Sequence, residues 1–177
     1  MLSPTGHGAE IGFAPSTLSA AASALAEAGL VDEARRAVLP ELFWELAGVW
    51  RPQWTWLAER PQPMDVGGGE MSWALTGDHV AVAYGAPLVS AGEGACELLV
   101  GAPVDVAVAA RRYGAALPGT GAAAVAVAPV AQALRGDGRM QGWRRASRLT
   151  VALGLAADPA RGREILQDWP GEGHVWL

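Results

Sequence analysis

Apolar residues recur at helical spacing close to the start of the chain, between residues 16 and 31. They stand at positions i, i+3, i+4, i+7 and i+10, which places them on one face of a helix: Leu18, Ala21, Ala22, Leu25 and Ala28. Ser16 is a favourable N-cap residue, and Gly29 is typical of the position just after a helix. The pattern therefore predicts an amphipathic helix that begins at Ser16 and ends before Gly29.

A second helix is predicted after a short polar link at residues 32–37. Pro40 suits a first helical position, and Pro52 cannot continue a helix. The apolar face between them consists of Leu42, Phe43, Leu46, Val49 and Trp50. Residues 60–69 then contain Pro61, Pro63 and three consecutive glycines, which is typical of a linker. We therefore expect a domain at 1–60, a linker at 61–70 and a second domain at 71–177.

In the second part, short apolar runs alternate with helical patterns. Strands are predicted at 71–76, 97–100 and 122–128, with a last edge strand at 174–177. Helices are predicted at 77–84, 103–113, 146–157 and 158–169. Such alternation indicates a small α/β domain of three or four strands. The whole chain is then expected to be α+β, with a helical N-terminal domain before it.

The distribution of charge gives mixed evidence on binding to nucleic acid. The chain carries a net charge of −5, which argues against strong nonspecific binding to nucleic acid. Residues 135–163, however, carry seven Arg against Asp137 and Asp158. Arg144, Arg145 and Arg148 are the candidates there for contacts with nucleic acid or an acidic partner, and a solvated face is the alternative.

Other features point away from catalysis, metal binding and the membrane. The three His are scattered, and the single Cys96 is expected to be a small buried thiol. The four Trp within residues 44–56 suggest an aromatic cluster, an interface or simple core filling. The longest apolar run, residues 122–131, is too short for a membrane span, and the start does not resemble a signal peptide. A cytoplasmic protein without cofactor, metal or membrane partner is expected.

Residues 15–31 resemble the recognition helix of winged helix-turn-helix transcriptional regulators. The shared features are the start Pro15-Ser16-Thr17-Leu18-Ser19 and the ending Ala28-Gly29-Leu30-Val31. The resemblance implies that this helix enters the major groove of double-stranded DNA. Its candidate contact residues are Ser16, Thr17, Ser19 and Ser23, with Arg35 and Arg36 in the wing. Since the helix offers no Arg, Gln or Asn for base reading, we expect a homodimer or help from Arg144, Arg145 and Arg148.

A second string resembles the opening of minimal nucleotidyltransferase-like domains. It runs from Trp73-x-Leu75-Thr76-Gly77-Asp78-His79 to Glu97-Leu98-Leu99-Val100. Those enzymes hold Mg²⁺ with two or three carboxylates on adjacent strands. Here the second strand has only Glu97, and the third has no acid, so an inactive domain is expected. Asp78 and His79 are neighbours on a helix and point about 100° apart, which argues against an acid–base pair.

The succession of these parts, ending in residues 153–169, is similar to actinobacterial regulators related to the AbiEi antitoxins of type IV toxin–antitoxin systems. The resemblance implies a repressor of its own operon with a toxin or other protein partner. Three interpretations follow: a DNA-binding regulator, an interaction or scaffold protein with a degenerate winged helix, and a nucleotidyltransferase-like enzyme. Arg161 and Arg163 allow a phosphate site, but pairing with Asp158 or Glu164 on a helical surface is the simpler interpretation.

Overall fold

The computed structural model describes residues 13–34, 36–63, 73–89, 94–169 and 176. The chain forms two compact units, residues 1–49 with 171–177, and residues 50–170. The boundary between them falls after Val49, and most of the predicted linker at 61–70 lies outside the described residues. A strand at residues 55–57 belongs to the sheet of the second unit.

The described part of the first unit contains helices α2 and α3 and an aromatic centre. α2 spans Pro15–Glu27 and α3 spans Glu41–Val49, close to the predicted ranges. Phe43 on α3 is buried, and its ring lies 5.2 Å from that of Trp44 and 5.6 Å from that of Trp176. The indole Nε1 of Trp44 donates a hydrogen bond of 3.2 Å to the carbonyl oxygen of Trp176. The C-terminal Trp176 is thus part of the first unit.

The prediction that Ser16 caps α2 is wrong. The helix begins at Pro15, and Ala14 is the N-cap residue without a side-chain hydrogen bond. Proline has no N–H to leave unsatisfied and its fixed φ suits the first helical position, so the N-cap lies two residues closer to the N-terminus than predicted.

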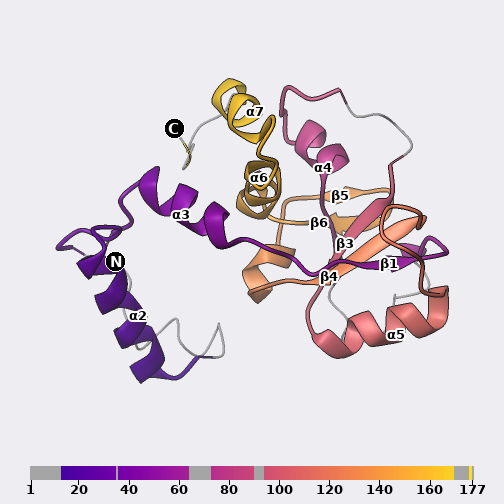
Figure 1. Cartoon of the computed structure of the whole chain (residues 1–177), viewed down its shortest axis with the longest axis horizontal. Helices are drawn as coiled ribbons and strands as arrows, with labels where there is room; N and C mark the ends of the chain where they lie inside the picture. Colours follow the sequence, from indigo (N-terminus) through magenta and orange to yellow (C-terminus); the bar gives the residue numbers. More distant parts are fainter. Residues whose placement is uncertain (1–12, 35, 64–72, 90–93, 170–175, 177) are drawn as a thin grey trace. The chain divides into compact units, whose positions relative to one another are not determined.

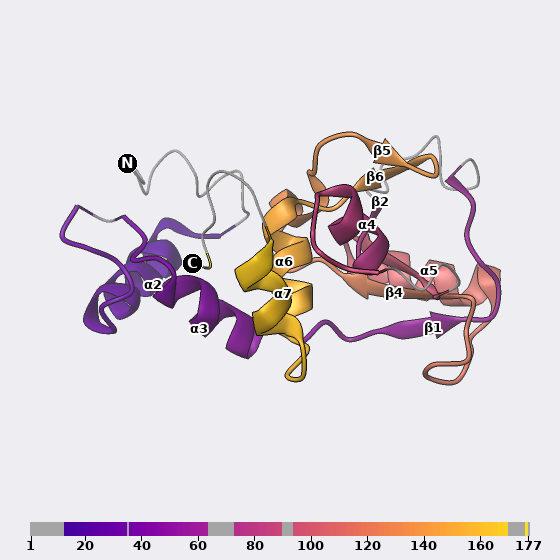
Figure 2. The same cartoon turned by 90° about the horizontal axis from the view of Figure 1, so that it is seen from above.

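The second unit is built on a six-stranded mixed sheet in the order β1-β4-β3-β2-β6-β5. The strands are β1 (Thr55–Leu57), β2 (Trp73–Leu75), β3 (Cys96–Val100), β4 (Ala123–Val127), β5 (Arg139–Met140) and β6 (Trp143–Arg145). β3 pairs antiparallel with β2 and parallel with β4. Figure 2 shows β1 along one edge of the sheet and β5 with β6 at the other.

Helices cover this sheet. They are α4 (Asp78–Ala83), α5 (Pro103–Tyr113), α6 (Arg148–Ala156) and α7 (Gly162–Asp168), with a 3₁₀ turn, η2, at Ala131–Leu134. In Figure 1, α5 lies below the sheet and α4, α6 and α7 lie above it. The predicted mixture of strands and helices is confirmed, but the sheet has six strands instead of the three or four expected. No helix among the described residues has the length and apolarity needed to cross a membrane.

Three strands were not predicted. β1 has three residues, and β5 and β6 form a hairpin of two and three residues rich in Arg. The hairpin turn is made by Gln141 and Gly142, with φ of 52° and 83°, as a two-residue turn between twisted strands requires. The predicted strand at 174–177 lies outside the described residues except for Trp176.

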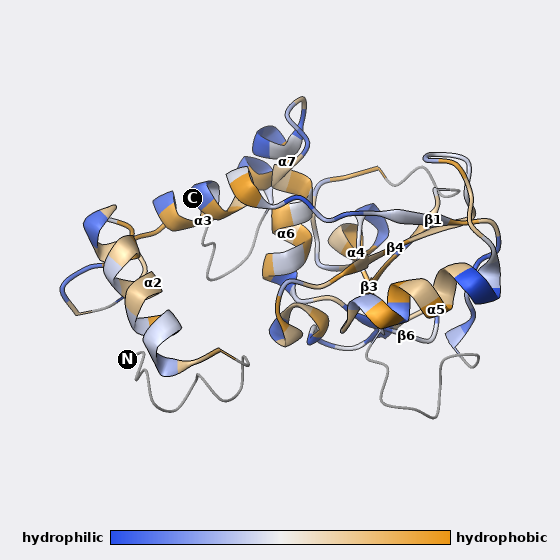
Figure 3. Ribbon diagram, turned by 60° about the horizontal axis from the view of Figure 1, so that its bottom comes forward, coloured by the Kyte–Doolittle hydropathy of each residue, from blue (hydrophilic) through white to orange (hydrophobic). Residues whose placement is uncertain are grey.

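The core of the second unit lies on both faces of β3 and β4. Leu98, Val100 and Val125 are fully buried, and Figure 3 shows these strands in hydrophobic colours. Trp169, at the end of α7, is also fully buried. Its Nε1 donates to the carbonyl oxygen of Tyr84 at 3.0 Å, and the guanidinium of Arg148 lies 4.9 Å from its ring. Trp169 thereby joins α7 to both α4 and α6.

We expect Trp169→Ala to lower the free energy of unfolding of the second unit by about 3–5 kcal/mol, because the substitution leaves a large cavity. Val104→Ala, on an exposed position of α5, is the control and should change it by less than about 0.5 kcal/mol. Denaturant unfolding followed by circular dichroism measures both. Equal effects of the two substitutions would contradict this role of Trp169.

Candidate functional site

One candidate surface is the outer face of α2 in the first unit. Thr17, Ser19 and Ser23 are exposed, as predicted for the residues that would meet DNA. Ser16 is exposed in the first turn. The opposite face carries Leu18, Ala22 and Leu25, which are half-buried, whereas Ala21 and Ala28 of the predicted apolar face are exposed. The helix thus exposes a row of hydroxyl groups on one face and packs through a narrow apolar stripe on the other.

The end of α2 is sharply defined. Leu30 N–H donates to the carbonyl oxygen of Leu25 at 2.9 Å, and Gly29 N–H donates to that of Ala26 at 3.0 Å. Gly29 has a φ of 71°, so this is the Schellman ending expected from the sequence. The turn satisfies the last carbonyl groups of the helix and reverses the chain.

A short hairpin follows the helix directly. Val31 pairs with Ala37 in an antiparallel bridge, and Asp32 N–H donates to the carbonyl oxygen of Arg36 at 2.9 Å. The Asp32 carboxylate in turn accepts from Arg36 N–H at 2.7 Å. The Arg36 side chain is exposed. Arg35, the other predicted contact residue of this hairpin, lies outside the described residues.

The arginines predicted near residues 144–148 do not form one exposed cluster in the second unit. Arg144 and Arg145 are consecutive on β6 and therefore point to opposite faces of the strand. Arg144 is exposed, but Arg145 lies over the ring of Tyr84 at 4.5 Å and donates to the carbonyl oxygen of Asp137. Arg148 stacks on Trp169. Two of the three guanidinium groups thus have structural contacts.

Because Gly29 has a positive φ with no atom nearby that would clash, we expect Gly29→Ala to destabilise the first unit by about 1 kcal/mol through backbone strain alone. Gly48→Ala is the matched control, since Gly48 lies in α3 with equally open space. It should leave stability unchanged or raise it by about 0.5 kcal/mol through helix propensity. Thermal unfolding followed by circular dichroism distinguishes the two, and equal effects would contradict the Schellman ending.

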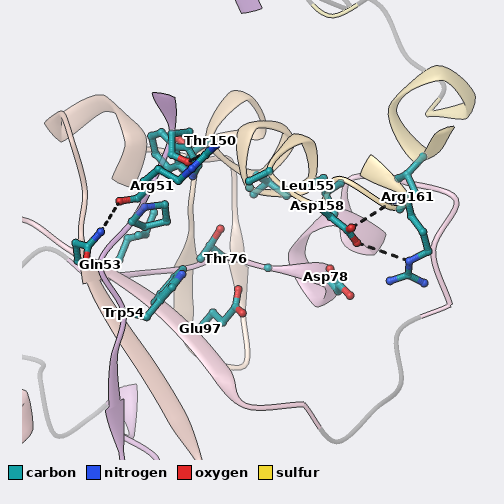
Figure 4. A pocket seen from close by; sticks show the side chains of 18 residues that line it. Arg51, Gln53, Trp54, Thr76, Asp78, Glu97, Thr150, Leu155, Asp158 and Arg161 are labelled. Carbon is teal, nitrogen blue, oxygen red and sulfur yellow. Dashed lines mark hydrogen bonds and ion pairs between the residues drawn. The ribbon is translucent and has the colours of Figure 1, made fainter. Parts of the chain in front are cut away.

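The other candidate site is a cavity of about 380 Å³ in the second unit. Its walls come from residues 50–54, the β2–α4 junction, β3, α6 and the segment that leads into α7. Figure 4 shows the Thr76 and Glu97 oxygen atoms directed into this space beside the indole of Trp54. Asp78, Asp158 and Arg161 lie along the rim. The volume falls in the range of small-molecule sites in proteins.

Strand pairing fixes the floor of the cavity. Thr76 N–H donates to the carbonyl oxygen of Glu97 at 2.9 Å, which continues the β2–β3 ladder into the loop. Gly77 follows with a φ of 83°, and a Cβ at this position would lie 2.5 Å from Glu97 Oε2. Glycine therefore lets the chain turn into α4 and also leaves room for the Glu97 carboxylate.

The Glu97 carboxyl group has unusual electrostatics. Burial raises its pKa, and the nearby Asp78 carboxylate raises it further. Within the described residues, the Glu97 side chain has no hydrogen-bond donor and no cation paired with it. An ionised carboxylate in such surroundings is energetically costly.

Two hydroxyl groups line the cavity as well, and they differ. The Thr150 hydroxyl lies 2.7 Å from that of Ser147 at the start of α6, so it has a partner. Thr76 is only 8% exposed, yet its hydroxyl has no hydrogen-bond partner in the described part of the chain. This oxygen is not fully enclosed, since it is directed into the same space as Glu97.

The other residues that the sequence singled out lie on the rim of the cavity, outside it or in the core. Arg161 Nε lies 3.7 Å from Asp158 Oδ2, so the prediction of a surface ion pair is confirmed. Asp78 lines the cavity and His79 does not. Cys96 is buried, and burial raises the pKa of its thiol, which disfavours the reactive thiolate. The expectation of a small buried thiol is confirmed.

Sequence reasoning missed most of the cavity. It singled out Glu97 but did not place Trp54, Thr76 or Gln53 at a binding site. Trp54 and Thr76 are far apart in the sequence, and only the β1–β4–β3–β2 order brings their segments together. One local feature of the sequence could have indicated the cavity. The Thr76-Gly77 pair lies between a predicted strand and a predicted helix, and the next predicted strand carries a single acid, Glu97.

Comparisons with family models, curated proteins and solved structures give no match.

The raised pKa of Glu97 predicts a pH-dependent stability. Ionisation opposes folding here, so stability falls as the pH rises from the ordinary carboxyl value of 4.5 through the raised pKa of Glu97 in the folded state, and it then levels off. Glu97→Gln removes this charge at constant shape, and we expect it to raise the melting temperature at about pH 7 but not below about pH 4. Glu59→Gln, at an exposed position of the same unit, is the control. A lower melting temperature for Glu97→Gln at neutral pH would contradict the prediction.

Proposed function

We propose that the protein is a DNA-binding transcriptional regulator whose first unit is a degenerate winged helix. The observation that carries the proposal is the uninterrupted order of helix, Schellman turn and antiparallel hairpin from Pro15 to Ala37. A recognition helix followed by a wing has this order of elements. The exposed hydroxyls of Thr17, Ser19 and Ser23 lie in the N-terminal half and middle of α2, where a recognition helix meets base edges and phosphates.

Charge determines how such a unit would bind. α2 has no basic residue, and the exposed Arg36 is the described cation closest to it in sequence. Hydroxyl groups and helix N-termini bind phosphates but distinguish bases weakly. We therefore propose a homodimer in which two first units contact one double-stranded site, with Arg35, Arg36 and Arg144 providing positive charge.

We also propose that the second unit is nucleotidyltransferase-like and lacks that activity. Its support is the succession of β2, the Gly77 turn, α4 and β3 with an acid facing a cavity. Metal-dependent transfer needs a carboxylate cluster. Among the described residues no group of three acidic, His or Cys side chains is placed to hold a metal ion. Together with the sequence resemblance, this favours a cytoplasmic antitoxin-like regulator of its own operon with a toxin or other protein partner.

A mobility-shift titration with the DNA upstream of the protein's own gene tests DNA binding. We expect a shift, and the logarithm of the binding constant should decrease linearly with the logarithm of the salt concentration. Arg36→Ala should reduce the magnitude of that slope by about 1. Thr17→Asp should weaken binding about tenfold or more, because it places a negative charge against phosphate. An acid in the first turn of α2 favours the helix, so the fold is retained.

Thr120→Asp is the matched control for this titration, because it adds the same charge at an exposed turn of the second unit. It should bind as the unmodified protein does. Absence of any shift at low salt with a dimer confirmed by light scattering, or equal affinities for Thr17→Asp and Thr120→Asp, would refute DNA binding through α2.

A protein-interaction module is the second candidate, and exposed apolar residues of the first unit favour it. Leu39, Leu46 and Val49 are 46%, 40% and 72% exposed. The apolar surface expected at residues 50–56 for such a module is not observed, since Trp50 is buried and Trp54 and Trp56 are half-buried. Leu46→Ser with Val49→Ser should abolish capture of a partner and leave the DNA shift unchanged if both functions coexist.

A further inference from the structure

We propose that the cavity of the second unit binds a small organic cation, with an ammonium group seated between Glu97, Thr76 and the indole face of Trp54. The inference does not depend on DNA binding by the first unit. It starts from two polar groups that face the same space without partners. Thr76 as a residue is 8% exposed and its hydroxyl oxygen is directed into the cavity, and Glu97 Oε2 lies next to Gly77.

The charge of the cavity selects the ligand class. Asp78, Glu97 and Asp158 are the carboxylates along its walls, and Arg51 and Arg161 are the cations. Arg161 pairs with Asp158, and Arg51 Nη1 donates to the carbonyl oxygen of Trp50 at 2.7 Å. This leaves the Glu97 carboxylate near the floor and the Asp78 carboxylate on the rim without a paired cation in the described part of the chain. A phosphate or carboxylate group placed there would meet like charge, whereas a cation would relieve it.

An organic cation fits better than a bare metal ion. No described set of three acidic, His or Cys side chains is arranged as metal ligands. A primary ammonium group instead needs a carboxylate, a further acceptor and an apolar or aromatic wall. Glu97 provides the first, the Thr76 hydroxyl oxygen the second, and Trp54 the third (Figure 4). The face of an indole attracts a desolvated cation.

The geometry of the strands keeps this arrangement rigid. Thr76 and Glu97 are joined through the backbone hydrogen bond that continues the β2–β3 ladder, and Leu99, two residues further along β3, also lines the cavity. The backbone positions of the binding groups are therefore set by the sheet, since Glu97 lies on β3, Thr76 directly follows β2 and Trp54 directly precedes β1.

Calorimetric titration of the full chain with benzylamine, agmatine and spermidine tests the proposal, and benzyl alcohol is the uncharged match for benzylamine. We expect at least one amine to bind with a Kd of about 1 mM or below, and benzyl alcohol to bind at least about tenfold more weakly than benzylamine if benzylamine is the amine that binds. Glu97→Gln should weaken the binding about tenfold or more, and Thr76→Val several-fold.

Glu59→Gln removes one negative charge at an exposed site of the same unit and should leave the Kd unchanged. Circular dichroism confirms that each variant is folded. Three results would overturn the proposal: no amine binds up to about 10 mM, Glu97→Gln binds as the unmodified protein does, or ATP with Mg²⁺ binds in place of the amines. The last result would identify the cavity as a nucleotide site instead.

Discussion

The pairing of β3 with its two neighbours is the constraint on which the second unit depends. β3 is buried along Leu98, Leu99 and Val100, and its backbone groups are satisfied only by an antiparallel partner on one side and a parallel partner on the other. The antiparallel register with β2 places Glu97 beside Thr76, and the parallel register with β4 places Ala124 beside Glu97 on the other side. A shift of one residue would turn Glu97 toward α5 and Leu98 into the cavity, so the position of the acid and the integrity of the core are fixed together.

Small side chains make this arrangement compact. β4 consists of Ala and Val only, and four of its five residues are buried. Helix α5 lies against the sheet on this side, and Asp105 near its start accepts a hydrogen bond from the N–H of Ala102 at 3.1 Å. On the other side, Gly162 permits the start of α7 to approach α6, because a Cβ there would lie 2.1 Å from the carbonyl oxygen of Leu155. Few large residues are left to fill the remaining space, and the tryptophans do so: Trp169 beneath α7, and Trp73 stacked on Trp143 with ring centres 5.8 Å apart.

The sequence was sufficient for elements whose pattern is long or sharply bounded. The helix at 103–113 has proline at its start and glycine after its end, and its bounds agree with the structure residue for residue. The strands at 97–100 and 122–128 agree within one residue at each end. β1, β5 and β6 were missed because two or three residues are too few for an alternating pattern, and their stability comes from neighbours that are distant in the sequence. Only the Gln141-Gly142 pair gave a local sign of the hairpin. The cavity was unpredictable for the same reason, since the strand order and not any motif joins Trp54, Thr76 and Glu97.

The contrast between the two units bears on how function is divided between them. α2 buries none of its residues fully and presents small hydroxyl side chains, so its surface can change in sequence without loss of the fold. The cavity has the opposite character, because Glu97 is held by strand pairing and its charge opposes folding at neutral pH. A neutral Gln in the same place would satisfy the sheet equally well at a lower free energy. The proposed binding of an organic cation would give the carboxylate at that position a role that stability does not. A partner that supplies positive charge and hydrogen-bond donors would convert this unfavourable group into a source of binding energy, and would link occupancy of the cavity to the stability of the second unit.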